Sequence, residues 1–190
     1  MIITLILLFL IFVALGFGLL AAFNDIKNFT IPNYISIGVV ICAILSLLIA
    51  NFFVADSIIF SDWKSHIISG ISVFVITYAL FYFGHIGGGD AKLLSAYALM
   101  VGGQGLMPLM FFMAIAGGLM GGFTLLLNKK TLFPSPKSGG WIDVAQKQGK
   151  KVPYAGAIFV GAVAAFWHNG YLSIDTYISI LSTVTNGAVS

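Results

Sequence analysis

Long stretches without a charged residue constrain this chain more than any other feature. The first runs from Ile2 to Phe23, and further apolar stretches follow it along the chain. A helix needs about 20 mostly apolar residues to cross a bilayer. With 59% hydrophobic and only 8% charged residues, the chain does not fit an ordinary soluble domain, where about a quarter of the residues are charged. We therefore expect an all-α, polytopic membrane protein.

The apolar stretches predict a six-span helical bundle that forms one membrane-embedded domain over residues 1–190. The expected spans cover residues 2–23, 33–54, 65–83, 91–103, 106–127 and 153–167. The first lacks the basic start and short apolar core of a cleavable signal peptide, so we expect it to be retained. The fourth is short, since roughly 13 residues of helix reach only about 20 Å. We expect a broken fourth helix that begins below the membrane surface, where non-helical backbone must be buried or line a wet cavity.

Lysine residues predict which loops face the cytoplasm. The loops after the first, third and fifth spans carry Lys27, Lys92 and a lysine cluster within residues 128–152, whereas the other loops carry only Lys64. The positive-inside rule places lysine-rich loops in the cytoplasm. The N-terminus is then expected outside, and the two acidic residues considered next fall on the cytoplasmic side.

The stretch around Asp90 indicates chemistry. Gly87, Gly88 and Gly89 precede this carboxylate in a glycine-rich loop, where the lack of a Cβ allows close backbone approach and positive φ. Ionisable residues at membrane depth are costly and indicate function by default. Asp25, in the polar loop expected over residues 24–33 after the first span, is the second candidate. Two neighbouring carboxyls can share one proton, so that one accepts a proton from water and the other donates to a scissile carbonyl.

Simpler interpretations of these residues remain open. Asp90 stands directly before an apolar run and is a good N-cap for a helix, and Asp25 fits the polar flank of a span. The lysines near both acids fit interface anchors. His85 can assist the acids or be incidental. Cys42 has no partner for an intramolecular disulfide and fits a small core residue.

Three segments together resemble the type IV prepilin peptidase family, which are membrane aspartic proteases with a Gly-x-Gly-Asp motif followed by x-Lys-Leu. In chain order they are Asp25 with Lys27 and Ile31-Pro32-Asn33, then Gly87-Gly88-Gly89-Asp90-Ala91-Lys92-Leu93, then Val152-Pro153-Tyr154-Ala155. The third resembles the family's Pro-Tyr-Ala segment, which opens the last span. Gly156 stands where the family often has proline.

The resemblance implies that Asp25 and Asp90 are the catalytic pair and that no metal or cofactor is needed. The residues it implies as a substrate-facing loop are Gly87, Gly88 and Gly89, and the supporting residues are Lys27, Lys92, Pro32, Asn33, Pro153 and Tyr154. It implies removal of the short basic leader of pilin-like precursors, after a glycine, at the cytoplasmic face of the prokaryotic inner membrane.

The chain is similar to the short, peptidase-only form associated with tight-adherence (Flp) pili, because it goes straight into its first span without the N-terminal methyltransferase region of larger members. Archaeal preflagellin peptidases are an equally minimal branch. The expected partners are a precursor protein with a hydrophobic helix, and membrane lipid, with no nucleic acid.

A small proton-coupled transporter is the alternative function, because intramembrane carboxylates and broken helices also mark ion pathways. The chain shows no inverted repeat, and both aspartates are expected towards one face, which favours the peptidase. A structural assembly factor is a third class.

Two features concern packing alone. The pairs Gly117-Gly118 and Gly121-Gly122 have a spacing that allows close packing of the fifth span. The tail over residues 172–190 has apolar residues at helical spacing, which fits an interfacial helix.

Overall fold

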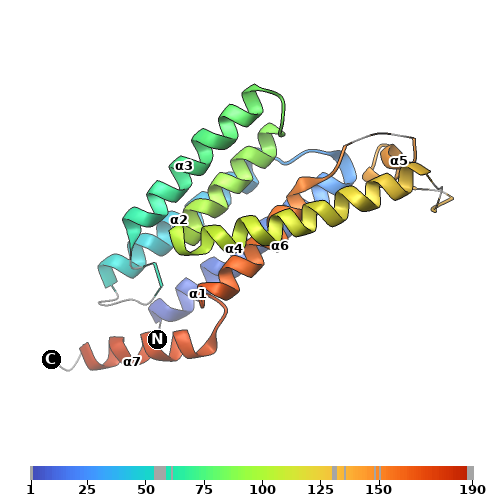
Figure 1. The fold of residues 1–190 in the computed structure, drawn as a ribbon. Helices are drawn as coiled ribbons and strands as arrows, with labels where there is room; N and C mark the ends of the chain where they lie inside the picture. The colour runs from blue at the N-terminus through green and yellow to red at the C-terminus, as the bar shows by residue number, and fades with distance from the viewer. Residues whose placement is uncertain are drawn as a thin grey trace.

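The computed structural model describes residues 2–53, 59–60, 62–129, 132–134, 136–147, 149 and 151–187. Every regular element in these residues is a helix, which confirms the all-α expectation (Figure 1). The helices are α1 (Ile2–Asn28), α2 (Asn33–Phe53), α3 (Trp63–Tyr82), α4 (Gly88–Lys129), α5 (Trp141–Gln146), α6 (Tyr154–His168) and α7 (Ile174–Gly187).

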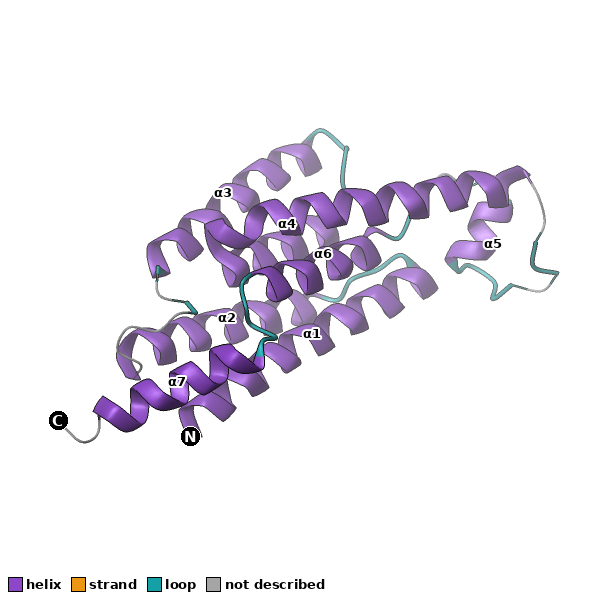
Figure 2. Ribbon diagram, turned by 60° about the horizontal axis from the view of Figure 1, so that its bottom comes forward, coloured by secondary structure: helices purple, strands orange, loops and turns teal. Residues whose placement is uncertain are grey.

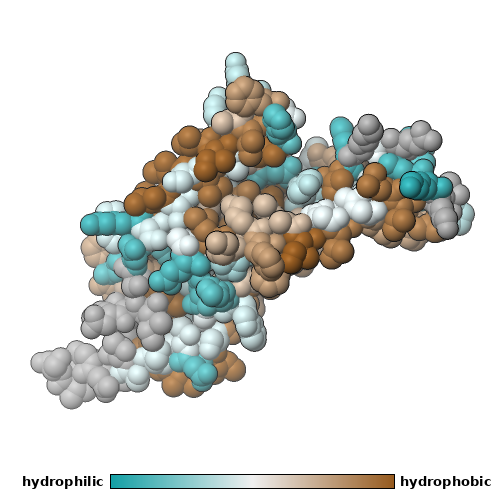
Figure 3. All heavy atoms as spheres, viewed as in Figure 1, coloured by the Kyte–Doolittle hydropathy of each residue, from teal (hydrophilic) through white to brown (hydrophobic). Residues whose placement is uncertain are grey.

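Four of these helices, α1 to α4, are long and apolar enough to cross a membrane, and α6 is apolar but has only 15 residues. Large apolar side chains are exposed along them, and Figure 3 shows apolar atoms gathered over α3 and the second half of α4. Aliphatic and aromatic side chains exposed in such numbers need an apolar solvent. These helices belong to a membrane protein.

The expected division into a short fourth and a longer fifth span is not confirmed. One helix of 42 residues, α4, extends over both expected spans. It is interrupted only in its backbone geometry, because Gly102 has φ 64° and ψ −174°, far from helical values. We call residues 88–101 the first segment of α4 and residues 103–129 its second segment.

The two segments of α4 have different neighbours. In Figures 1 and 2 the early part of α4 runs beside α3, and the rest runs beside α6 towards α5. Glycines make both contacts close: a Cβ on Gly70 of α3 would lie 2.9 Å from Leu99 Cβ, and a Cβ on Gly161 of α6 would overlap the Leu109 carbonyl oxygen. Each segment is therefore packed against its own partner helix.

The first helix is longer than expected. The sequence predicts a polar loop over residues 24–33, but α1 continues to Asn28. It ends because Phe29 adopts a left-handed conformation with φ 51°, and the Phe29 N–H donates to the Asp25 carbonyl oxygen at 2.8 Å. A residue of this conformation is a common helix stop. Asp25 consequently lies on a helix rather than in a loop.

Buried contacts tie α1 to the rest of the bundle. The hydroxyl of Tyr97, in the first segment of α4, donates to the Ala14 carbonyl oxygen at 2.7 Å in the core. A Cβ on Gly18 would overlap that hydroxyl, and Gly38 of α2 faces the Phe17 ring just as closely. These glycines let α1 pack tightly against both α2 and α4.

The bundle has two polar ends, which we name for later use. At the cavity end, α1 and α3 end while α4 and α6 begin. At the kink end, α3 begins, α6 ends and Gly102 interrupts α4.

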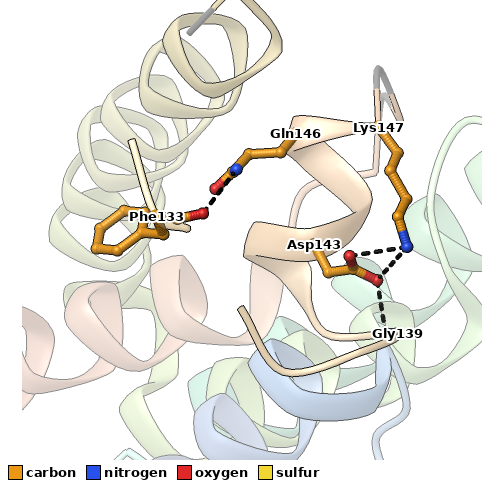
Figure 4. Close-up of polar contacts among 5 residues, drawn as sticks. All are labelled: Phe133, Gly139, Asp143, Gln146 and Lys147. Carbon is orange, nitrogen blue, oxygen red and sulfur yellow. Dashed lines mark hydrogen bonds and ion pairs between the residues drawn. The ribbon is translucent and has the colours of Figure 1, made fainter. Parts of the chain in front are cut away.

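The short helix α5 was not expected from the sequence. It packs against α1 and the second segment of α4. Local bonds shape it: Asp143 pairs with Lys147 at 2.8 Å and accepts from the Gly139 N–H at 2.8 Å, while Gln146 donates to the Phe133 carbonyl (Figure 4).

Candidate active site

A cavity of about 660 Å³ lies at the cavity end of the bundle. Asp25 and Asp90 both line it, although they are far apart in the sequence. Its other lining residues come from the end of α1, the loop after α3, both segments of α4, the start of α6 and the residues just before α6. They are Phe29, Gly84, His85, Ile86, Gly87, Leu94, Met113, Lys151, Val152, Tyr154 and Ile158.

Asp25 is held in place by a helix that begins far along the chain. It sits in the last turn of α1 and is only 6% exposed. Its Oδ2 accepts a hydrogen bond of 3.0 Å from the backbone N–H of Ala155 in the first turn of α6. The first N–H groups of a helix need acceptors, and Pro153, the N-cap of α6, provides no side-chain hydrogen bond. Asp25 therefore caps α6 from another helix.

Asp90 lies in the first turn of α4, where the helix dipole favours a negative charge. It is inside the helix rather than directly before it, so the N-cap interpretation does not describe its position. Its Oδ1 is buried and accepts no hydrogen bond from any described residue. The carboxyls of Asp90 and Asp25 are close enough for their charges to interact. The site thus contains one anchored and one incompletely bonded carboxyl.

The three glycines before Asp90 make room for close contacts. A Cβ on Gly87 would lie 2.8 Å from Asp90 Oδ2, and a Cβ on Gly88 would lie 3.1 Å from the Phe81 ring. A Cβ on Gly89 would lie 3.0 Å from Ile31 Cβ. The positive φ that we considered for this loop belongs instead to Gly84, at 75°. Gly87 lets the Asp90 carboxyl lie against its backbone, and the other two glycines let neighbouring segments pack on α4.

Two predicted supporting residues bind each other outside the cavity. Lys92 Nζ donates to Asn33 Oδ1 at 3.0 Å and so joins the start of α4 to the start of α2. Both face a separate groove of about 530 Å³ between α2, α3 and the first segment of α4, whose lining is mostly apolar and contains neither aspartate. These residues therefore link the starts of two helices outside the cavity.

The remaining supporting residues have different positions. Lys27 is exposed, with its Nζ 5.9 Å from the centroid of the Phe23 ring. Pro32 precedes α2, and its carbonyl oxygen accepts from the Ile35 N–H at 3.1 Å. Pro153 precedes α6, and Tyr154 lines the cavity. A Cβ on Gly117 would lie 3.0 Å from the Tyr154 ring, so Tyr154 links α6 to the second segment of α4.

Sequence reasoning missed part of the cavity. Lys151 lines it, with Nζ 5.9 Å from the centroid of the Phe29 ring, and Met113 brings in the second segment of α4. The Ala155 N–H was also missed, although a helix that starts with proline and has no polar N-cap signals N–H groups in need of an acceptor. His85, named from the sequence, does line the cavity. Within the described residues, no group of three or more His, Cys, Asp or Glu side chains could hold a metal ion.

Comparison with known proteins gives one match. The model of the type IV leader peptidase family matches residues 12–122, a range that includes both aspartates and the glycine-rich loop. Searches of curated proteins and of solved structures found no match.

Proposed function

The chain belongs to the type IV leader peptidase family, and from this premise we propose that it is an aspartic endopeptidase in which Asp25 and Asp90 form the catalytic pair. Family membership implies a peptidase with a protein substrate. The observation that carries the aspartic assignment is that one cavity is lined by both carboxyls, which come from the ends of different helices.

The proposed chemistry is general acid–base hydrolysis by two carboxyls that hold one proton between them. The ionised carboxyl takes a proton from water, whose oxygen attacks the scissile carbonyl carbon. The protonated carboxyl donates to the carbonyl oxygen, and the intermediate collapses as the leaving amine is protonated. The bond from Ala155 fixes the Asp25 end of the pair. The free Oδ1 of Asp90 leaves one acceptor available to water or substrate.

The proposed substrate is a pilin-like precursor with a short basic leader, a glycine and a hydrophobic helix. Cavity size supports a peptide substrate, since pockets of about 300–1,000 Å³ suit small ligands or short segments. A helix hides its peptide bonds, so the cleaved segment must unwind, and glycine unwinds at low cost. Leu94, Met113 and Ile158 provide an apolar wall for residues that enter from the membrane.

We propose that the cavity end faces the cytoplasm and that α4 crosses the membrane twice, once with each segment. The lysine-rich loops support this orientation. The double crossing is supported by Gly102, which meets the start of α3 and the end of α6 at the kink end, opposite Asp90. With α1, α2, α3 and α6 this gives six crossings and an external N-terminus. Labelling of a cysteine placed at Lys151 only from outside the cell would contradict this orientation.

The proposed function is tested by cleavage of a purified precursor in lipid nanodiscs. We expect Asp25→Asn and Asp90→Asn each to abolish leader removal while the protein still inserts, because neither amide can take a proton from water. Asp175→Asn is the matched control, since this residue in α7 does not line the cavity, and it should cleave at the wild-type rate. Normal cleavage by either single cavity variant would refute the pair.

Transport is distinguished by a second measurement on the same purified protein, now placed in proteoliposomes. Ion flux into proteoliposomes that depends on Asp90, without cleavage of any precursor bearing a leader, would favour a proton-coupled transporter instead.

A further inference from the structure

The break in α4 frees backbone groups inside the packed bundle at the kink end. A non-helical residue interrupts the ladder in which each N–H donates to the carbonyl four residues earlier. The carbonyls just before Gly102 then need other donors, because a buried polar group without a hydrogen-bond partner destabilises the fold. The structure supplies these donors from side chains.

Three consecutive carbonyls before Gly102 each accept a side-chain hydrogen bond. The bonds are His66 Nδ1 to the Leu99 oxygen at 2.9 Å, Tyr171 Oη to the Met100 oxygen at 3.3 Å, and Asn169 Nδ2 to the Val101 oxygen at 2.7 Å. After the break, the Gly103 N–H donates to Ser65 Oγ at 2.9 Å. We call Ser65, His66, Asn169 and Tyr171 the kink clamp.

The kink clamp is built from two separate parts of the chain. Ser65 and His66 belong to the first turn of α3, whereas Asn169 and Tyr171 follow the end of α6. A carbonyl can only accept, so His66 donates through Nδ1–H. A Cβ on Gly102 would lie 2.9 Å from the His66 ring, and the space left at the clamp is only about 60 Å³. The clamp therefore fits around a glycine in this one conformation.

The two segments of α4 meet at the clamp, and each of them helps to position a different carboxyl. The first segment carries Asp90 itself. The second segment packs against α6 through Gly117 and Tyr154, and the next residue of α6, Ala155, holds Asp25 through its N–H. A change in the angle between the segments at Gly102 would therefore move the Ala155 N–H, and with it the Asp25 carboxyl that this N–H holds, relative to Asp90.

We propose that the kink clamp is a remote positioning device for the aspartate pair: His66 and its neighbours fix the angle of α4 at Gly102 and thereby the separation of the two carboxyls. This rests on the proposed function for its catalytic consequence, although the geometric consequence can be measured without catalysis. The clamp residues touch no substrate, so they are positioning residues and not catalytic ones.

The test uses a conservative pair of variants at His66. His66→Ala removes the donor to Leu99, whereas His66→Asn keeps a nitrogen donor close to the position of Nδ1. Thr77→Val is the control, because Thr77 bonds Ser95 at the same interface of α3 and α4 but away from the kink. Tyr171→Phe removes a single hydroxyl and replaces His66→Ala as the test variant if the alanine variant fails to insert.

Two measurements are made on each variant in nanodiscs. The first is kcat and KM for precursor cleavage. The second is the distance distribution between spin labels at Tyr82 and Leu126, which are 78% and 59% exposed, in a background with Cys42→Ala. Tyr82 reports on α3 and the first segment, and Leu126 on the second segment.

We expect His66→Ala to lower kcat about tenfold or more, since a misplacement of 1 Å can cost about 100-fold, with KM nearly unchanged and a broader label distance. His66→Asn should restore both, and Thr77→Val should change neither. A wild-type label distance in His66→Ala, and in Tyr171→Phe, would overturn the proposal. If the wild-type protein cleaves no precursor, the proposed function fails, and the label distances alone decide on the clamp.

Discussion

The two polar ends of the bundle differ in which oxygen atoms have hydrogen-bond partners. At the kink end, the carbonyls of Leu99, Met100 and Val101 each accept a hydrogen bond from a side chain. The empty space beside them is only about 60 Å³. At the cavity end, Asp90 keeps a carboxyl oxygen with no partner among the described residues, beside a cavity of about 660 Å³. Some of the backbone is non-helical at both ends, but the side chains pack closely only around the non-helical residue at the kink end.

This difference separates a structural joint from a candidate reactive site. A buried polar atom without a partner costs about 1–3 kcal/mol. The kink end avoids that cost at each freed carbonyl, although Asn169 Oδ1 there is buried without a partner among the described residues. The cavity end retains it at Asp90, where a free acceptor can serve water or substrate. We expect function where the fold leaves a polar group without a hydrogen-bond partner. We expect rigidity where each freed carbonyl accepts a hydrogen bond.

Gly102→Ala is expected to have the largest effect on stability, because it changes the residue around which the kink end is packed. The backbone of Gly102, with φ 64° and ψ −174°, is in a region almost restricted to glycine, which costs an alanine about 1–3 kcal/mol, and the alanine Cβ would also press on the His66 ring. We expect the free energy of unfolding to fall by about 2 kcal/mol or more. Thermal unfolding in detergent, followed by helical circular dichroism, measures this as a lower Tm.

Gly122→Ala is the matched control for that substitution. Gly122 lies in the same helix, but no atom lies within 4 Å of a Cβ placed there. Alanine should be neutral or more stable by about 0.5–1 kcal/mol in a helix interior. Equal Tm values for the two variants would show that the kink end is not a tightly specified joint.

The sequence predicted the parts of the fold that depend on local pattern. The expected spans 33–54 and 65–83 agree closely with α2 and α3, because an apolar run between polar residues defines a span by itself. The end of α1 was missed, since Phe29 with φ 51° is not a residue type that signals a helix stop. The six residues of α5 were also missed, because they are held by contacts with Phe133 and Gly139 rather than by periodicity.

Tertiary contacts explain the remaining differences. The glycines at 117, 118, 121 and 122 suggested close packing, but only Gly117 meets a neighbour, because α6 begins beside it at Tyr154. The kink at Gly102 depends on hydrogen bonds with side chains of residues 65–66 and 169–171, which no local pattern connects to it. At the site, lysine parity predicted that Asp25 and Asp90 lie at one end, and the structure places both on one cavity. Their catalytic role stays a prediction.

Substitutions of the two aspartates should distinguish the anchored carboxyl from the open one. Asp25→Ala removes the acceptor for the Ala155 N–H, whereas Asp25→Asn keeps an oxygen there. Loss of a helix cap costs about 1 kcal/mol, so we expect Asp25→Ala to be less stable than Asp25→Asn by about that amount. For Asp90, the carboxyl interacts with the Gly87 backbone but caps no other helix, and its Oδ1 bonds no described residue. The stabilities of the Ala and Asn variants should therefore differ less at position 90 than at position 25.

Chemical unfolding of the four variants in one detergent measures these differences. A larger gap between Ala and Asn at position 90 than at position 25 would reverse the assignment of anchored and open carboxyls.

The smallest expected effect concerns α5, which lies over the cavity end and is held by exposed local bonds. The hydrogen bond from Lys147, followed by that from the Gly139 N–H, lowers the pKa of Asp143 below its usual range (Figure 4). A lowered carboxyl pKa means stabilisation that is complete above the unfolded value of about 3.9 and is lost as the pH falls through the folded pKa. Exposure of the Lys147 side chain, at 70%, makes this contribution small and sensitive to salt.

The fluorescence of Trp141 can report whether α5 loosens from the second segment in acid, because Trp141 Nε1 donates to Thr124 Oγ1 in that segment at 2.9 Å. With Trp63 and Trp167 replaced by phenylalanine, we expect its fluorescence to change below about pH 4, and Asp143→Asn should already show the acid signal at neutral pH. A flat acid titration of the parent would mean that α5 is fixed by Trp141 and not by the Asp143 bonds. The difference in packing between the cavity end and the kink end would then be smaller, since α5 would be held as firmly as the two segments of α4 are at Gly102.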